Sequence, residues 1–307
     1  MKRSELRAEK RKKRRWLRIP LIGIGIIFLA LIAWGTYIFM EARNTVNEKM
    51  YTEIDSIDRD LSKKKVKAKD NLNILMLGID STTGDAGRSD SLIIVNLRPQ
   101  EDKMKMISIP RDTRTVIAGR GYEDKINHAY AFGGAEMAIE TVENFLGIEI
   151  DYHVRMNMQG LKELIDELGG ITVTNDIEWG DSKYHFNKGS VELDGEKALA
   201  YVRMRKQDPE GDFGRAKRQR QVIEQIINKG ANIATVTNIT STMDILGDNM
   251  ETSLDFADMR RLLTGYSSTR NNVEQYQVQG SGAMIDGIYY YIVSEDEVRK
   301  VNGMLLN

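Results

Sequence analysis

The sequence predicts an α/β domain that is layered around a central sheet and preceded by one transmembrane helix. Two observations support this fold class. From Asn71 onward, short apolar runs alternate with segments of helical periodicity, a pattern typical of strands interleaved with helices. Before that point, an arm rich in Lys and Arg leads into an uncharged stretch that is long enough to cross a bilayer.

The N-terminal segment is predicted to be a signal anchor. Residues 1–18 carry ten Lys or Arg residues and two acids, whereas residues 19–40 carry no charge at all. A hydrocarbon core about 30 Å thick needs about 20 apolar helical residues, so this 22-residue stretch is long enough. No small-residue cleavage site follows it. Because Lys and Arg stay on the cytoplasmic side, we expect a single-pass type II protein of the cell membrane with an extracellular domain.

Charge and cysteine content narrow the class of protein further. The net charge of the chain is −1, but the cytoplasmic basic arm of residues 1–18 contributes +8, so the remainder carries −9. A basic arm can bind nucleic acid, but beside a membrane helix it is explained as a topology signal that meets anionic lipid, and no nucleic acid is expected. The chain has no cysteine, which suits the outer face of a single-membrane, Gram-positive bacterium.

The remaining elements can be assigned in chain order. Residues 41–70 are polar with spaced apolar residues and predict an extracellular stalk, either a juxtamembrane helix or a loose spacer. A closing section should hold a helix near 254–266, strands near 273–279 and 286–293, and a helix from about 295. Between them we expect strands at 73–79, 91–97, 104–109, 151–156 and 171–176, and helices at 135–146, 157–168, 194–203 and 212–230.

Two carboxylates are predicted at the ends of neighbouring strands. Asp80 follows the first strand directly, and Asp90, with Arg88 two residues before it, precedes the second. Carboxylates brought together by a short loop can hold a hard cation such as Mg²⁺ through oxygen ligands. The alternative is that both aspartates are ordinary turn and cap residues.

Arginines form the second part of the predicted site. Arg111 comes directly after the third strand, where Pro110 ends the ladder, and an ordinary surface arginine is the alternative. We expect Arg203 and Arg205 to share one side of an extended segment, and Arg215 and Gln219 to share one face of a helix, with Asp212 nearby. Arginine is the preferred side chain for binding phosphate oxygens, because its planar guanidinium group can donate two parallel hydrogen bonds. If these groups meet, they form a pocket for a doubly phosphorylated group and a metal; otherwise they belong to a solvated helix face.

Five motifs in register resemble the LytR-CpsA-Psr family. They are LGID, RSD, SIPRD, the segment LDGEKALAYVRMR and GDFGRAKRQRQ, and they span roughly residues 70–230. The resemblance implies an α-β-α sandwich with a central mixed sheet, formed by an extracellular catalytic domain over 71–307 whose motif-bearing core is 71–230. It also implies a hydrophobic tunnel for a polyprenyl tail, for which the apolar helices 135–146 and 157–168 are candidate walls.

The same resemblance implies a phosphotransferase of the cell wall. Its expected donor is an undecaprenyl-pyrophosphate-linked anionic glycopolymer, and wall teichoic acid is the polymer that the resemblance favours. Its expected acceptor is peptidoglycan, through a phosphodiester to the 6-hydroxyl of N-acetylmuramic acid. The resemblance assigns the pyrophosphate to Arg88, Arg111, Arg203, Arg205, Arg215 and Gln219, and Mg²⁺, or Mn²⁺ in its place, to Asp80 and Asp90. The expected catalytic residues are Asp80, Asp90, Arg111 and Asp212, and the general base is open among the three aspartates.

Other functions use the same residues. A membrane-anchored transcription attenuator would act through the basic arm, although the arm is short and has no helix-turn-helix pattern. A non-catalytic binder of polyprenyl phosphates would need only the arginines. A pyrophosphatase would need only water in place of the sugar hydroxyl. The paired aspartates favour catalysis, because carboxylates repel a diphosphate unless a cation lies between them.

Overall fold

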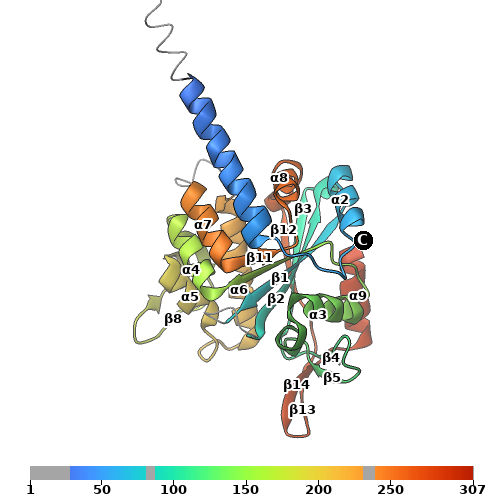
Figure 1. Cartoon of the computed structure of the whole chain (residues 1–307). Coiled ribbons are helices and arrows are strands. Elements are labelled where there is room, and N and C mark those ends of the chain that lie inside the picture. Colours follow the sequence, from blue (N-terminus) through green and yellow to red (C-terminus); the bar gives the residue numbers. More distant parts are fainter. Residues whose placement is uncertain (1–27, 81–86, 231–238, 307) are drawn as a thin grey trace, which may run out of the picture. The chain divides into compact units, whose positions relative to one another are not determined.

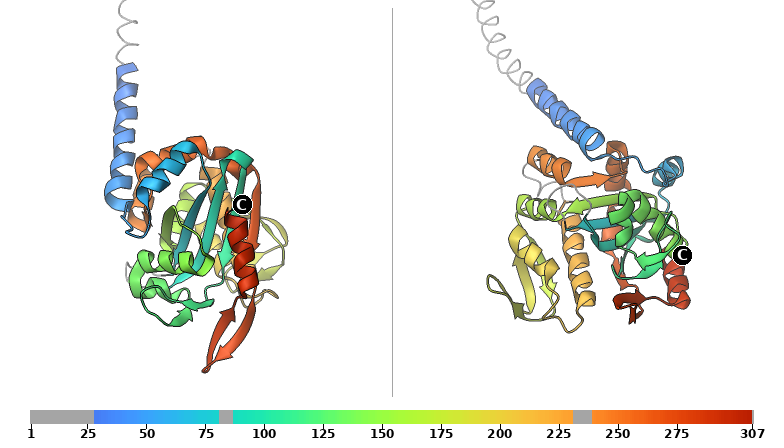
Figure 2. Two further views of the ribbon diagram at one scale, coloured as in Figure 1. Left: turned by 90° about the vertical axis from the view of Figure 1, so that its right-hand side faces the viewer. Right: turned by 60° about the horizontal axis from the view of Figure 1, so that its bottom comes forward.

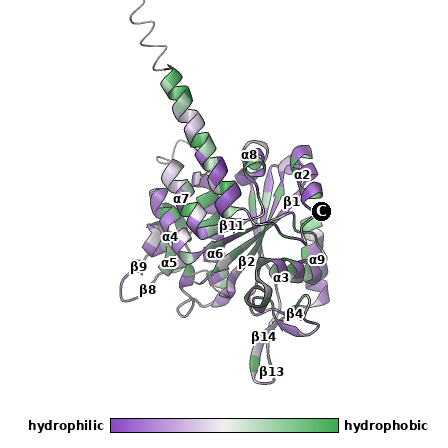
Figure 3. Cartoon of the chain, in the orientation of Figure 1, coloured by the Kyte–Doolittle hydropathy of each residue, from purple (hydrophilic) through white to green (hydrophobic). Residues whose placement is uncertain are grey.

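The structure is a computed structural model that describes residues 28–80, 87–230 and 239–306. The chain divides into two compact units, residues 1–44 and residues 45–307. The described part of the first unit is helical from residue 28 to residue 44, and Figure 3 shows that the start of this helix is hydrophobic. Residues 1–18 and 19–27, which carry the predicted arm and the first part of the predicted span, lie outside the described residues. Among the helices that are described, none is both long and apolar enough to cross a bilayer.

The second unit is organised around a six-stranded sheet, as Figure 1 shows. The strand order is β11-β6-β1-β2-β3-β12. The three central strands form an antiparallel meander, β6 and β12 are parallel to their neighbours, and β11 is antiparallel to β6. The prediction of a central mixed sheet is therefore confirmed. The strands are β1 (Leu72–Ile79), β2 (Ser89–Arg98), β3 (Lys103–Ile109), β6 (Tyr152–Asn157), β11 (Met250–Thr252) and β12 (Val273–Gln277).

Helices cover both faces of this sheet because its central strands are apolar on both sides. Successive residues of β1 illustrate this: Ile74 belongs to one buried cluster and Leu75 to the other. On the Leu75 side lie α3 (His128–Leu146) and α9 (Glu295–Leu306). On the Ile74 side lie α2 (Arg59–Ala68), α6 (Asp212–Gly230) and α8 (Phe256–Gly265).

A third buried cluster lies beyond the sheet, between α6 and a group of short elements. Its aromatic centre is formed by Trp179, Phe186 and Tyr201, and the rings of Trp179 and Phe186 stack at 4.1 Å. Val222 and Ile226 of α6, the helix that carries several predicted site residues, pack in this cluster. The other elements that contribute to this cluster are α4 (Met158–Glu167), β7 (Ile171–Asn175), β8 (Trp179–Gly180), β9 (His185–Phe186), β10 (Gly189–Leu193) and α5 (Gly195–Arg203). Helix α7 (Ile239–Asn249) packs against α4.

The predicted stalk needs correction from Thr45 onward. Ile54 and Ile57 belong to the core cluster on the α3 face, and Val66 of α2 belongs to the opposite one. The spaced apolar residues of this segment are therefore core residues of the domain. The sequence did not reveal this, because each of them is isolated between polar neighbours. The segment also contains the π-helical turn η1 (Thr45–Met50).

Several short elements were not predicted or were predicted with other bounds. Helix α3 begins seven residues before the predicted start at residue 135, since it continues across a kink at Gly133 and Gly134. The hairpin formed by β13 (Ser281–Ile285) and β14 (Ile288–Ile292) projects away from the sheet, as Figure 2 shows. The remaining short elements are η2 (Pro99–Glu101), β4 (Arg114–Val116), β5 (Glu123–Lys125) and η4 (Ser267–Asn271).

Candidate active site

The register of the central meander brings three predicted site residues to one edge of the sheet. Ile79 at the end of β1 lies opposite Ser89 of β2, and Leu92 of β2 lies opposite Ile109 of β3. Asp80 directly follows Ile79, Asp90 directly follows Ser89, and Arg111 lies two residues after Ile109. The order of strands in the sheet therefore places two carboxylates and a guanidinium group at one end of the meander.

Arg111 connects the strand-end carboxylates with the loop that follows β3. Its Nη1 donates a hydrogen bond of 2.7 Å to Oδ1 of Asp90, and its Nε lies 3.8 Å from Oδ2 of Asp112. The other oxygen of Asp112 pairs with Nζ of Lys125 at 2.8 Å. Burial by itself would lower the pKa of Arg111, but the hydrogen bond and negative charge of Asp90 outweigh burial and raise it. Arg111 is thus a fully charged guanidinium group held at the edge of the sheet.

Helix α6 brings Asp212 and Arg215 to the same edge of the sheet. Arg215 is only 13% exposed and its Nη2 lies 3.3 Å from Oδ1 of Asp212. Nε of Arg205 lies 3.3 Å from the same oxygen. Burial, and after it the positive charge of Arg111, lowers the pKa of Arg215. Two partly desolvated guanidinium groups that repel each other form a site in which an anion is stabilised.

A polar pocket joins these groups. Arg215 and Gln219 both line it, so they share one face of α6 at the predicted spacing. Its walls come from β2, β3, the loop after β3, the first turns of α6, and the β13–β14 hairpin. The lining residues are Asp90, Ser91, Leu92, Ser108, Ile109, Pro110, Arg111, Asp112, Asp212, Phe213, Arg215, Ala216, Gln219, Gln277, Tyr289 and Tyr291.

Four of the predicted residues lie outside this lining. Nη2 of Arg203 donates a hydrogen bond of 2.8 Å to Oδ1 of Asp80, and both side chains are 52% exposed. Arg205 reaches the pocket only through its contact with Asp212. Arg88 is exposed just before β2. Helix α5 extends through Arg203, so the extended segment expected to hold both Arg203 and Arg205 begins only at Met204.

Arg218 has a structural role in this region. It is buried and pairs with Asp208, and it also donates hydrogen bonds to the carbonyl oxygens of Tyr201 and Met204. These bonds hold the loop after α5 against α6. Gly214 is required here, because a Cβ at this position would collide with the Asp208 carboxylate. The loop that presents Arg205 is therefore fixed by a buried ion pair.

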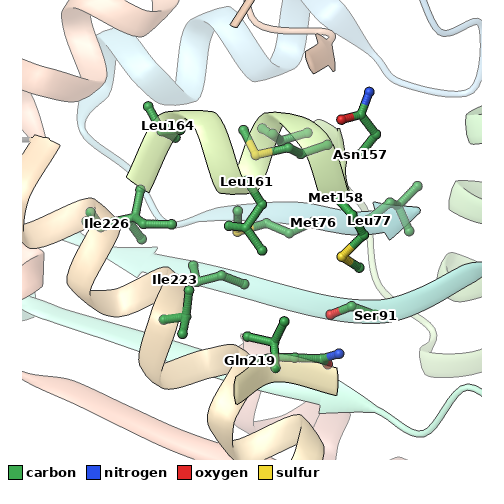
Figure 4. A pocket seen from close by; sticks show the side chains of 16 residues that line it. Met76, Leu77, Ser91, Asn157, Met158, Leu161, Leu164, Gln219, Ile223 and Ile226 are labelled. Atoms are coloured by element: carbon green, nitrogen blue, oxygen red, sulfur yellow. The ribbon is translucent and has the colours of Figure 1, made fainter. Parts of the chain in front are cut away.

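An apolar cavity adjoins the polar pocket, and Figure 4 shows it from close by. Its accessible volume is about 120 Å³, and two residues, Ser91 and Gln219, line both cavities. Helix α4 forms one wall, as the prediction for helix 157–168 implied, but α6 forms the other. Helix α3 packs on the opposite face of the sheet, so the predicted helix 135–146 does not line this cavity. The remaining lining residues are Met76, Leu77, Gly78, Val154, Met156, Asn157, Met158, Leu161, Leu164, Val202, Val222, Ile223, Ile226 and Ile227.

Sequence reasoning missed several residues of the polar pocket. Asp112 belongs to the SIPRD motif and directly follows Arg111, so its position offered a signal that was not used. Phe213 lies within the GDFGRAKRQRQ motif in the same way. Tyr289 and Tyr291 come from the last part of the chain, where the motifs end, and only the folded hairpin brings them to the pocket.

The two strand-end aspartates could offer oxygen ligands to Mg²⁺ in one particular mode of binding. Asp80 and Asp90 each accept a hydrogen bond from an arginine at Oδ1, so Oδ2 of each carboxylate could serve as a metal ligand. Within the described residues, no group of three or more His, Cys, Asp or Glu side chains is arranged to hold a metal. Mg²⁺ is commonly bound by one or two carboxylates together with waters and substrate phosphates, and the donor set agrees with that mode.

Comparison with known proteins defines the class to which this fold and site belong. The sequence model of the LytR_cpsA_psr family matches residues 36–306, and the chain belongs to this family. It is 43% identical, over 98% of both chains, to a protein of Bacillus licheniformis named polyisoprenyl-teichoic acid–peptidoglycan teichoic acid transferase TagU.

Solved structures agree with this assignment. One is described as TagT bound to LI-WTA; it is 32% identical with a TM-score of 0.66, over 85% of this chain and 94% of that one. Another, from Enterococcus faecalis, is described as a transcriptional regulator; it is 40% identical with a TM-score of 0.71, over 78% and 88% of the two chains.

Proposed function

We propose that this protein transfers a lipid-linked anionic glycopolymer, wall teichoic acid, from undecaprenyl pyrophosphate to peptidoglycan. The observation that carries the proposal is the junction of the two cavities at Ser91 and Gln219. A pocket with two guanidinium groups suits a pyrophosphate, and an apolar cavity directly beside it suits the prenyl chain of the same molecule. The B. licheniformis relative carries the name of this activity.

The proposed reaction is a phosphoryl transfer. The 6-hydroxyl of N-acetylmuramic acid attacks the phosphorus on the sugar side, a new P–O bond forms, and the P–O bond to the lipid phosphate breaks. The products are a phosphodiester and undecaprenyl phosphate. Arg111 and Arg215 stabilise the charge on the phosphate oxygens, and the exposed pair Asp80–Arg203 lies outside the lining of the pocket. Asp80, Asp90 or Asp212 takes the hydroxyl proton.

A divalent cation belongs to the same proposal. Asp80 and Asp90 would hold Mg²⁺, or Mn²⁺, together with phosphate oxygens of the donor. When bound, the ion supplies positive charge that screens the carboxylates from the diphosphate. Replacing both aspartates by Asn should therefore abolish transfer while lipid binding through the arginines persists, and EDTA should reproduce this loss in the native chain. Undiminished, EDTA-insensitive transfer by the double variant would remove the metal from the proposal.

We also propose that residues 19–40 anchor the chain in the cell membrane with the domain from Thr45 onward outside. The basis is the run of ten cations before an uncharged stretch of 22 residues. An anchor would keep the enzyme in the same plane as its lipid-linked donor. Protease added to intact protoplasts should digest the domain and spare a tag at the N-terminus, whereas protection of the whole chain would contradict this topology.

The decisive experiment follows a labelled donor. The full chain in phospholipid vesicles is given a lipid-pyrophosphate glycopolymer with label in the sugar, together with peptidoglycan oligomers. Transfer moves the label onto the oligomers. Release of label without attachment would indicate a pyrophosphatase, and label that remains bound on its lipid would indicate a non-catalytic binder.

A further inference from the structure

The β13–β14 hairpin forms part of the wall of the polar pocket and extends beyond it. Its two strands are joined by Asp286 and Gly287, both with positive φ (51° and 78°), as a tight hairpin turn requires. It projects from the body of the domain in the views of Figures 1 and 2. Its tip nevertheless exposes apolar side chains: Met284 is 66% exposed and Ile288 49%.

The base of the hairpin is fixed to the loop that carries Arg111. The backbone N–H of Tyr291 donates a hydrogen bond of 2.8 Å to the carbonyl oxygen of Asp112, and Tyr291 forms a parallel bridge with Thr113. Tyr290 is 8% exposed, and its ring lies against Arg114 and Lys125, with cation-to-centroid distances of 5.8 and 5.9 Å. The position of the hairpin is thus coupled to the residues that surround the pyrophosphate pocket.

On the opposite face of the hairpin, two tyrosine rings lie over glycine residues. Side chains alternate along β14, so Tyr289 and Tyr291 face away from Tyr290. A Cβ on Gly282 would lie 2.7 Å from Cε2 of Tyr289, and one on Gly280 would lie 2.8 Å from Cε1 of Tyr291. Each ring therefore occupies the space that a side chain on the diagonally adjacent glycine would need. Both rings line the polar pocket, Tyr291 buried and Tyr289 46% exposed.

We propose that this face of the hairpin is the binding surface for the acceptor glycan, with a sugar ring stacked on Tyr289. The proposal rests on the proposed function, because it names the place of the second substrate. The donor would occupy the arginines and the apolar cavity, so the acceptor must enter along a wall that remains open. Tyr289 is an exposed aromatic wall of the pocket, and the C–H face of a sugar packs well on an aromatic ring. Its ring is held over Gly282, so little conformational freedom is lost on binding.

The test separates the two substrates of the full chain in vesicles. Tyr289→Ala should raise the KM for peptidoglycan glycan oligomers by about threefold to tenfold, the value of one aromatic contact. The KM for the labelled lipid-linked donor should stay unchanged. Tyr289→Phe should retain normal acceptor binding. Gly282→Ala should raise the acceptor KM as well, because it displaces the ring without removing it.

Ile288→Ser is the matched control. It removes a side chain of similar exposure from the opposite face of the same hairpin, and it should leave both KM values unchanged. An unchanged acceptor KM in Tyr289→Ala, an equal rise in the donor KM, or an equal effect of Ile288→Ser would each overturn the proposal. If the native chain transfers nothing, the proposed function fails. Direct binding of the oligomers by the native chain and by Tyr289→Ala then still decides the role of the hairpin.

Discussion

The polar pocket and the apolar cavity share two residues but are built on different principles. In the polar pocket each charged group is held by named partners, such as Asp90 on Arg111 and Asp212 on Arg215. Most of the cavity lining consists of Leu, Ile, Val and Met side chains, which have no groups that form directional hydrogen bonds. The identity of a residue should therefore matter in the pocket, whereas mainly volume and apolarity should matter in the cavity.

The largest effect is expected from Arg111→Ala. This change removes a charge from the proposed phosphate site and also removes the hydrogen bond that Asp90 accepts from Arg111. We expect transfer to fall by about 100-fold or more, since contacts that strengthen in the transition state are worth several kcal/mol. Arg111→Lys keeps the positive charge but cannot donate two parallel hydrogen bonds, so its transfer rate should lie between those of the Ala variant and the native chain. Initial rates of transfer from a labelled donor measure this, and native rates in the Ala variant would contradict the assignment.

A smaller effect is expected when the cavity is filled. Ile223→Trp places a larger side chain between α6 and α4, where the prenyl tail should lie. The KM for a long-chain donor should rise about tenfold, whereas a donor with a very short chain should be used almost as before. Overpacking can also destabilise the fold by about 1–3 kcal/mol, so the melting temperature must be measured beside the rates. An equal loss for both donors would indicate that the tail lies elsewhere.

The smallest effect should come from Leu161→Met. Both side chains have similar volumes, and the cavity already contains Met76, Met156 and Met158. Transfer should change less than about twofold, and unfolding should cost less than about 1.5 kcal/mol. Thermal unfolding and the transfer assay together test this. A loss of transfer rate as large as that in Arg111→Lys would contradict the view that residue identity matters in the pocket and only side-chain volume and apolarity matter in the cavity.

Much of the fold could be predicted because its signals are local. The central strands read as continuous apolar runs, and α6 has helical spacing over its whole length, so the sheet and the edge bearing Asp80, Asp90 and Arg111 followed from sequence. The walls of the cavity did not, because apolar periodicity shows that a helix is buried but not which face of the sheet it covers. That is why the helix at 135–146 was a candidate wall although α3 packs on the other side.

The segments that escaped prediction depend on distant contacts. Residues 45–70 join the core through isolated apolar side chains such as Ile54 and Ile57, which a window of local hydropathy treats as a polar spacer. Tyr289 lies 178 positions after Arg111 in the chain, and contacts such as the hydrogen bond from Tyr291 to Asp112 bring it to the pocket. No spacing rule reaches over such a distance.

The boundary at Ser91 and Gln219 has a thermodynamic consequence for an amphiphilic substrate. A methylene group that leaves water for an apolar cavity gains about 0.8 kcal/mol, but one that leaves a bilayer exchanges one hydrocarbon environment for another. For a donor embedded in a membrane, the tail should thus add almost nothing to affinity, and discrimination should rest on the charged head. The same donor dispersed in water should bind more tightly with every added isoprene, so affinities measured without a bilayer would reflect partitioning of the tail as well as recognition by the protein.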